Sequence, residues 1–287
     1  KSDTNLRDIS ADGKLILFST STMELNRYPF DRTSIYCYNV DDNRIDTIFT
    51  DTIGIDRCQF SPDSKSILFS GTADAFGGVG KVIPKDVIPN TYDNQLFLYD
   101  IAQKTVKPLT KNFNPSVSSF VWSSFDGNIY LTAEDGFTKP FYALNPKTCE
   151  IRKFNYPVDF VQNFSISENS DAVVLYGQGP TYARRMVTAK LSDKKEKYQN
   201  IGNIHFEKEF ANVTIPEFHR WRYLSSRGDS IDGFYYLPTH FDANKQYPLI
   251  VYYYGGCTPT NETLEKNYPF AVWANQGYVV YVVEPSG

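Results

Sequence analysis

The sequence predicts a mainly β protein in which about four blades of a partial β-propeller precede the start of an α/β sheet. Three observations lead to this prediction. A polar turn followed by an apolar strand occurs four times before residue 200, and a hairpin followed by strand, helix and strand comes after residue 204. Aromatic residues make up 16% of the 287 residues, a bias that favours strands.

Each repeat begins with a tight turn between two strands. An Asp or Asn in the turn folds back on its own backbone, and a Gly or Ser relaxes the next torsion. An apolar strand then follows. The turns and the strands after them are Ser10–Lys14 with Leu15–Ser19, Ser61–Lys65 with Ser66–Ser70, Ser124–Asn128 with Ile129–Leu131, and Ser167–Asp171 with Ala172–Tyr176.

A second pair of strands completes each repeat. These pairs are Ser34–Val40 with Arg44–Phe49, Gln95–Tyr99 with Val106–Leu109, Phe141–Leu144 with Ile151–Phe154, and Arg185–Leu191 with Glu196–Ile201. Four strands in each repeat are the signature of propeller blades, and the uneven spacing of the turns indicates loop insertions on a common blade. Propeller rings contain roughly four to eight blades. A closed ring of four is rare, and nothing in the sequence resembles a closing strand supplied from the two ends, so we expect an arc of a larger ring.

The largest insertion is Thr72–Asp93, which contains the glycine-rich run Gly77–Gly80 and two prolines. A phosphate cradle would need a helix after the glycines and a closing Lys-Ser or Lys-Thr pair, and neither pattern occurs. We therefore predict a long flexible loop. Its length alone suggests the hypothesis that it faces the propeller cavity and helps to hold a substrate.

The pattern changes after residue 204. A hairpin with a glycine-containing turn, then a strand, a helix and a second strand predict the opening of an α/β sheet with a right-handed crossover. Pro269 suits the first turn of the helix, and Gly277 suits its C-terminal cap. The predicted elements are Trp221–Leu224, Ile231–Leu237, Leu249–Tyr254, Pro269–Gln276 and Tyr278–Val283.

The strand Leu249–Tyr254 is the centre of this second region. Its continuous run of aliphatic and aromatic residues predicts a parallel strand buried on both faces. Gly255 and Gly256 follow, so the backbone can turn sharply there and another group can approach closely. Tyr254 therefore stands at the carboxyl end of a strand, where open α/β sheets place their ligands.

Composition and charge exclude several function classes. A net charge of −4 gives no electrostatic reason for a nucleic-acid partner. The four cysteines lack zinc-site spacing, so neither a metal nor another cofactor is expected. No apolar run reaches the roughly 18 residues of a membrane span. The polar segment Lys1–Arg7 lacks the apolar stretch of a signal peptide, but a signal could have been removed or lie upstream. The compartment therefore stays open, with a periplasmic or secreted location favoured over the cytoplasm.

The joining of blade repeats to this α/β opening resembles the prolyl oligopeptidase family of serine peptidases. The matching motifs are Asp232–Pro238, Tyr247–Val251 and Tyr254–Gly256, in that order. The resemblance implies a propeller that gates an α/β-hydrolase domain, which cuts short peptides with a Ser-Asp-His triad. It also implies that the Tyr254 hydroxyl donates to the oxyanion, and that Cys257 lies at the wall of the first substrate pocket. The alternatives to these functional roles are structural: Tyr254 would be an aromatic residue at the end of a strand, and Cys257 a small buried residue.

The sequence departs from the family at the catalytic triad. No Gly-x-Ser-x-Gly motif occurs, and Ser286 lies far before the expected serine elbow. The family's catalytic histidine follows the serine, so His205, His219 and His240 are expected to be surface or hairpin residues. We therefore expect a fragment that is inactive alone, with blades over residues 1–203, the start of the hydrolase domain over 204–287, and the triad outside this chain.

Two other functions compete with the peptidase interpretation. A non-catalytic propeller module could bind peptide or protein through its loops, but such a module has no reason to contain residues 221–287. An esterase or another hydrolase of the same fold is the third reading, because substrate choice depends on loops that are not in this sequence. A peptide is the expected partner, and a homo-oligomeric full-length enzyme is compatible with the sequence.

Overall fold

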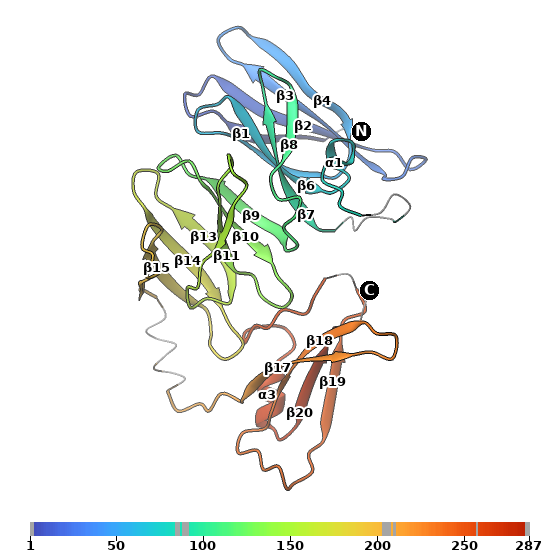
Figure 1. The fold of residues 1–287 in the computed structure, drawn as a ribbon, viewed down its shortest axis with the longest axis vertical. Coiled ribbons are helices and arrows are strands. Elements are labelled where there is room, and N and C mark those ends of the chain that lie inside the picture. Colours follow the sequence, from blue (N-terminus) through green and yellow to red (C-terminus); the bar gives the residue numbers. More distant parts are fainter. Residues whose placement is uncertain are drawn as a thin grey trace. The chain divides into compact units, whose positions relative to one another are not determined.

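The computed structural model describes residues 3–83, 87, 92–202, 208, 211–256 and 258–284 (Figure 1). The chain forms two compact units, Lys1–Ala133 with Tyr142–Arg152, and Glu134–Phe141 with Lys153–Gly287. The domain boundary predicted between residues 203 and 204 falls among residues outside the described ranges and stays a prediction.

Four sheets of four strands each form most of the fold, and each keeps its strands in chain order. Short connections make neighbouring strands antiparallel, as in the pairs β2 with β3 and β14 with β15. The mainly β fold with four blade-like sheets is therefore confirmed. The strands are β1 (Asp3–Ile9), β2 (Leu15–Met23), β3 (Asp31–Asn39) and β4 (Arg44–Thr52); β5 (Ile55–Phe60), β6 (Ser66–Thr72), β7 (Asn94–Asp100) and β8 (Thr105–Pro108); β9 (Ser116–Trp122), β10 (Ile129–Glu134), β11 (Phe141–Leu144) and β12 (Ile151–Lys153); and β13 (Phe160–Ile166), β14 (Ala172–Gln178), β15 (Arg185–Lys190) and β16 (Tyr198–Asn200).

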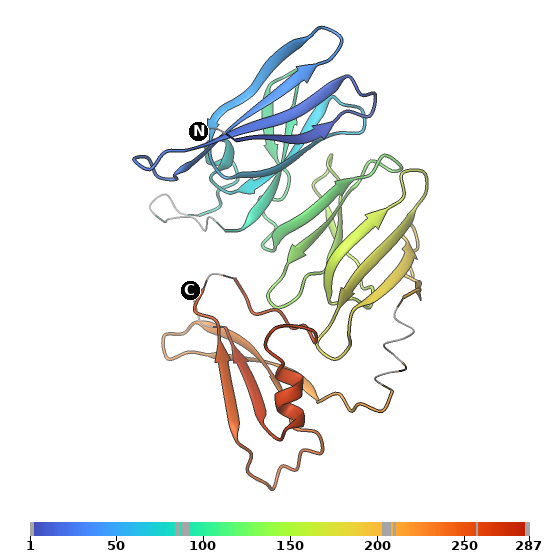
Figure 2. The ribbon, with the colours of Figure 1, turned by 180° about the vertical axis from the view of Figure 1, so that it is seen from behind.

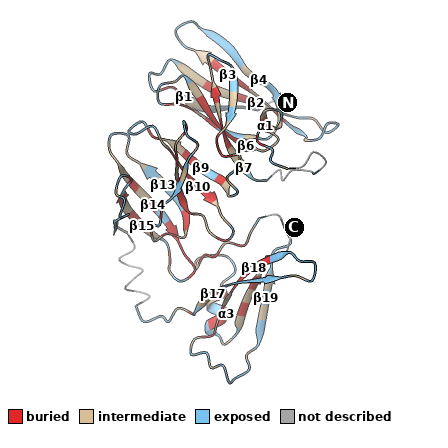
Figure 3. Cartoon of the chain, in the orientation of Figure 1, coloured by how far each residue is buried: buried red, intermediate tan, exposed pale blue. Residues whose placement is uncertain are grey.

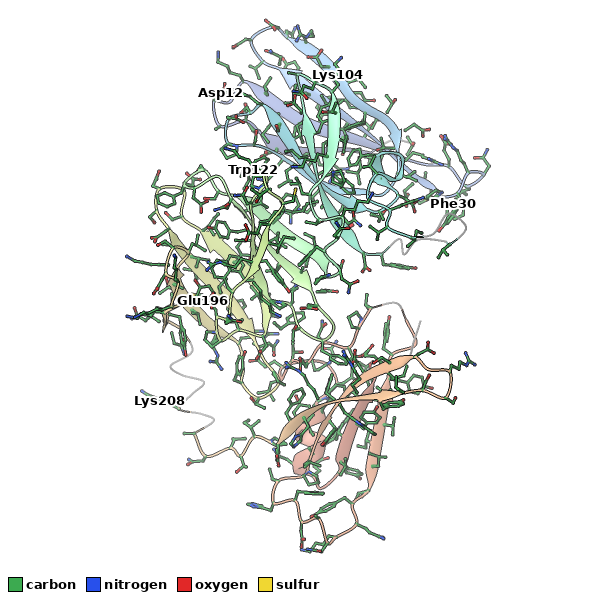
Figure 4. The ribbon with its side chains drawn as sticks, in the orientation of Figure 1. Asp12, Phe30, Lys104, Trp122, Glu196 and Lys208 are labelled. Carbon is green, nitrogen blue, oxygen red and sulfur yellow. The ribbon has the colours of Figure 1, made fainter. Side chains whose placement is uncertain are left out.

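The repeated turns are closed by side-chain hydrogen bonds, as the sequence predicts. Ser10 Oγ donates to Asp12 Oδ1 over 2.7 Å and accepts from the amide of Leu15 over 2.9 Å. Gly13 takes a φ of +74°, which glycine adopts without strain. Asp12 is labelled at this turn in Figure 4. The second turn repeats the network with Ser61, Asp63 and Ser66 at 2.6 and 2.9 Å.

The first three sheets share two hydrophobic clusters. Ile67 and Phe69 of β6 pack with Leu17 and Ile35 of the first sheet. Leu68, which points to the other face of β6, packs with residues of the third sheet such as Leu131. Strand β6, one of the two inner strands of the second sheet, is therefore buried on both faces. Figure 3 colours buried residues red.

The insertion after β6 begins with a packed turn. Residues Ala75–Gly78 form the short element α1, although Phe76 and Gly77 have positive φ angles of 54° and 72°. The Phe76 ring lies 4.9 Å from that of Phe49 and 5.2 Å from that of Phe69. The prediction of a flexible loop is therefore wrong for this part, because one aromatic ring anchors it in the core. Residues 84–86 and 88–91 of the insertion lie outside the described ranges.

A fifth sheet and a helix follow the blades, as predicted. The sheet has the order β17-β18-β20-β19, with β17 antiparallel to β18 and β19 parallel to β20. Figure 2 shows the helix α3 beside this sheet. The elements are β17 (Phe218–Leu224), β18 (Ser230–Tyr236), β19 (Leu249–Tyr253), α3 (Phe270–Asn275) and β20 (Val279–Val283).

The helix α3 covers one face of this sheet. Phe270 and Ala274 are buried, and the Phe270 ring lies 5.2 Å from that of Tyr252. Pro269 precedes the helix at its N-cap, and Gly277 follows it with a φ of +97°. Both predicted helix boundaries are confirmed to within a residue.

The prediction that Leu249–Tyr254 is buried on both faces is wrong for the described chain. β19 lies at the edge of the sheet, and only the face with Ile250 and Tyr252 packs in the cluster around α3. On the other face, Leu249 is 58%, Val251 51% and Tyr253 66% exposed. Alternate residues of one strand point to opposite faces, so a covering on one side protects every second side chain.

Among the described residues, no helix has both the length and the apolar content needed to cross a membrane.

Candidate active site

Tyr254 directly follows β19 at the carboxyl end of the parallel pair. The register pairs Tyr253 with Val283, so the chain ends its β19 segment beside the end of β20. The Tyr254 side chain is 49% exposed. A Cβ atom on Gly256 would overlap the Tyr254 ring, so the ring can fold against the backbone only because residue 256 is glycine. The phenol is therefore both positioned at the strand end and accessible.

Glu284 lies at the same edge, directly after β20. Its amide donates to the carbonyl oxygen of Asp232 over 3.0 Å, which fixes the backbone. Its Oε1 atom accepts a 2.7 Å hydrogen bond from the amide of Thr260. Burial raises the pKa of the Glu284 carboxyl, while the Thr260 hydrogen bond and the charge of Lys266 act in the opposite direction.

Lys266 is a half-buried lysine whose charge acts on this carboxyl. Its Nζ atom donates to the carbonyl oxygen of Asn261 over 2.8 Å and lies 4.7 Å from the centre of the Phe270 ring. Burial lowers the pKa of Lys266 to about 8, and the charge of Glu284 opposes this change. The lysine is thus held by the aromatic face of α3 and by its own loop.

The segment 258–268, here named the edge loop, carries Thr260, Glu262 and Lys266. Glu262 is 0% exposed, and its carboxylate accepts hydrogen bonds from Arg220 Nε at 2.9 and 3.0 Å. Arg220 comes from β17, and its second contact, from Nη2, is 2.6 Å long. The Glu262 amide also donates to the carbonyl oxygen of Phe137 over 3.1 Å. An ion pair with several contacts to the buried Glu262 carboxylate therefore fixes the middle of the edge loop.

The end of the edge loop is bound to the fourth blade-like sheet. The Glu265 amide donates to Gln178 Oε1 over 2.7 Å, and Gln178 Nε2 donates to the Glu265 carbonyl over 3.2 Å. Arg184 Nη1 lies 2.8 Å from Glu265 Oε2. These contacts join the end of β14 and the connection to β15 to the edge loop, and they lie within one compact unit.

This arrangement supplies an accessible hydrogen-bond donor beside a hydrogen-bonded loop. The phenol of Tyr254 can donate to an oxygen that acquires negative charge, because O–H groups stabilise such charge when they are already oriented. The carboxyl of Glu284 and the amine of Lys266 already make hydrogen bonds with the backbone of the edge loop. Their role here is to hold the loop at the strand ends.

The sequence located Tyr254 but missed the residues that frame it. Glu284 could have been found, because it follows a buried strand whose carboxyl end meets the same sheet edge as Tyr254. Glu262 and Lys266 carry no such signal. They stand in a polar loop, and only the fold reveals that Glu262 is buried and Lys266 half-buried.

The remaining predicted residues are placed as follows. Cys257, Ser286 and His205 lie outside the described residues. His219 Nε2 lies 2.9 Å from Glu217 Oε1, and its ring stacks on Tyr235. His240 is exposed. These two histidines are hairpin and surface residues, as expected.

Comparison with known proteins shows what the chain is similar to. No protein-family model matches it. A curated relative from Aspergillus niger, named "Probable dipeptidyl-peptidase 5", is 24% identical over 294 residues, which are 98% of this chain and 38% of the relative. This chain therefore spans well under half the length of that relative.

Solved structures give the same fold. Puromycin hydrolase matches 98% of this chain and 41% of its own, with a TM-score of 0.65 and 16% identity. Dipeptidyl peptidase 4 of Porphyromonas gingivalis matches 98% of this chain and 49% of its own, with a TM-score of 0.58 and 15% identity. The resemblance to peptidases of the prolyl oligopeptidase family, which the motifs predicted, is confirmed.

Proposed function

We propose that this chain is part of a serine peptidase of the prolyl oligopeptidase family that hydrolyses short peptides. The observation that carries the proposal is the joining, in one chain, of four blade-like sheets to a parallel strand pair with an accessible tyrosine at its carboxyl end. The similarity to a dipeptidyl-peptidase over 98% of the chain supports it. A plain propeller module has no need of the fifth sheet.

In this proposal Tyr254 donates its hydroxyl hydrogen bond to the oxyanion that forms when the peptide carbonyl is attacked. The triad of Ser, Asp and His belongs to the longer protein, since no Gly-x-Ser-x-Gly motif occurs among the 287 residues. Residues 1–203 form the blades that gate access, and residues 204–287 begin the hydrolase domain. Cys257 lines the first substrate pocket.

The proposed partner is a peptide and not a nucleic acid, which agrees with the net charge of −4. The proposal requires no metal or other cofactor. A homo-oligomeric full-length enzyme is compatible with it.

The test is hydrolysis of dipeptidyl chromogenic amides by the full-length protein and by its Tyr254→Phe variant. Because the variant loses one oxyanion donor, we expect kcat to fall by about 100-fold or more with little change in KM. Tyr253→Phe is the matched control. It removes the same hydroxyl from the neighbouring residue, which is the last residue of β19, and should retain activity.

Three other outcomes would contradict parts of this proposal. Unchanged turnover in Tyr254→Phe would remove the tyrosine from the site. Hydrolysis of esters without hydrolysis of peptide amides would favour an esterase. Binding of peptides without any hydrolysis by the full-length protein would favour a non-catalytic module.

A further inference from the structure

The first unit contains a polar cavity of about 350 Å³ where the opening strands of its three sheets meet. Arg7 and Asp8 of β1, Arg57 and Gln59 of β5, and Phe120 of β9 line it. All of these residues belong to one compact unit, and they come from the first strand of each of its three sheets.

Arg7 is held in a fixed orientation at this cavity. Its Nε atom donates to Ser19 Oγ over 2.8 Å, and its Nη1 atom donates to the carbonyl oxygen of Asp56 over 2.8 Å. Both acceptors are uncharged. The guanidinium keeps its charge available, together with further N–H donors.

In the described part of the chain, the Arg57 side chain contacts an aromatic ring instead of hydrogen-bond acceptors. Its guanidinium carbon lies 5.4 Å from the centre of the Phe120 ring, and Phe120 is buried, so the ring is a fixed platform. Within the described ranges, the Arg57 side chain makes no ion pair with a carboxylate. An arginine that is exposed and stacked on a ring, but lacks a counter-ion, is ready to bind an anion.

The acidic groups near the cavity leave a positive balance. Asp8 is the carboxylate in its lining, and Asp8 Oδ2 accepts a 2.7 Å hydrogen bond from the amide of Phe60. Asp56 lies outside the lining, and its Oδ2 atom accepts from Ser70 Oγ over 3.3 Å. The cavity lining therefore contains two guanidinium groups and one carboxylate, and that carboxylate already accepts a hydrogen bond from a backbone amide.

We propose that this cavity binds a carboxylate of a peptide, with Arg57 and Arg7 as the two cationic donors. A planar guanidinium matches a carboxylate with two parallel hydrogen bonds, and a fixed ring reduces the entropy lost when the arginine is ordered. The carboxylate is either the C-terminus of the peptide or an acidic side chain. That the ligand is a peptide rests on the proposed function, whereas the preference for a carboxylate rests on the arginines.

The test is calorimetric titration of the 287-residue chain with three short peptides of otherwise equal sequence. The first has a free C-terminus and Gln, the second an amidated C-terminus and Glu, and the third an amidated C-terminus and Gln. The third peptide should bind at least about tenfold more weakly than one of the others, because a charge-assisted hydrogen bond is lost. Affinity for the preferred peptide should fall as salt is added.

Arg57→Gln should remove this preference for a carboxylate. Arg57→Lys keeps the charge but cannot form the two parallel hydrogen bonds of a guanidinium, so it should retain only part of the preference. The matched control is Arg44→Gln, which removes the same charge from β4, where Arg44 pairs with Asp46 at 3.0 Å. Preference for the first peptide identifies the C-terminus as the ligand, and preference for the second identifies a side chain.

Equal affinities for all three peptides, or an Arg57→Gln variant that binds like Arg44→Gln, would overturn the proposal. Binding is measured without turnover, so its failure is distinct from that of the proposed function. The latter is tested by hydrolysis of uncharged dipeptidyl amides by the full-length protein.

Discussion

Two strands that each contain a run of apolar residues, β6 and β19, have opposite environments. In β6, Ile67, Leu68 and Phe69 are all fully buried, because hydrophobic clusters lie on both faces of the sheet. In β19, Leu249 and Val251 are more than half exposed, because the strand is at an edge and one face alone is covered. Figure 3 shows the contrast in colour.

The contrast shows what an apolar run in a sequence can and cannot predict. It predicts that a strand forms, since β-branched and aromatic side chains suit a pleated surface. It does not predict how many layers cover that strand. Coverage depends on residues far away in the chain, such as those of the third sheet that pack on Leu68.

The largest effect that tests this contrast comes from the same substitution in the two strands. Leu68→Ala removes a fully buried side chain and should lower the free energy of unfolding by about 2–5 kcal/mol. Leu249→Ala removes a side chain that is 58% exposed, and should cost about 0.5 kcal/mol or less. Urea unfolding of the chain measures both. Equal losses would show that β19 is covered on both faces.

The blade-like sheets were predictable because their information is local. Each turn is closed by residues within five positions of one another, as Ser10 with Leu15 and Ser61 with Ser66 show. A pattern of that length is visible in the sequence and repeats four times. The strands that follow it were therefore located to within a few residues.

The frame of the candidate site was not predictable for the opposite reason. Glu262 meets Arg220, and Glu265 meets Gln178, across 42 and 87 positions of sequence. Nothing near Glu262 marks it as buried, since its neighbours Asn261 and Thr263 are polar. Tyr254 could be found because its position follows from one strand and two adjacent glycines.

The next largest effect should come from the ion pair between Arg220 and the buried Glu262 of the edge loop. Arg220→Ala leaves the fully buried Glu262 carboxylate without its partner, and should destabilise the second unit by about 2 kcal/mol, less than a wholly buried pair because Arg220 is 57% exposed. Arg222→Ala is the matched control. Arg222 is a neighbour on β17, and its partner Asp232 is itself exposed, so the loss should be close to experimental error.

Thermal unfolding, followed by the fluorescence of tryptophan, measures this pair of variants. A loss in Arg220→Ala no greater than that in Arg222→Ala would mean that the edge loop is not held by Glu262. In that case the framing of Tyr254 would depend on the contacts of Glu265 and Glu284 alone.

The smallest effect is a change in how stability depends on pH. Burial raises the pKa of Glu284, so the folded protein holds that proton more tightly than the unfolded chain does. The protonated form therefore contributes stability below the ordinary glutamate pKa, about 4.3, and that contribution is lost as the pH rises through the folded-state pKa. Glu284→Gln keeps the neutral shape and the acceptor for Thr260, and it cannot ionise.

We therefore expect Glu284→Gln to gain stability relative to the parent chain as the pH rises from about 4 to about 7. Urea unfolding at the two pH values gives the difference, and Glu150→Gln, at an exposed position, corrects for the loss of one negative charge. If Glu284→Gln loses stability relative to the parent chain over this range, Lys266 and Thr260 outweigh burial. The ionised carboxylate would then stabilise the edge loop beside Tyr254 through its contacts with Thr260 and Lys266.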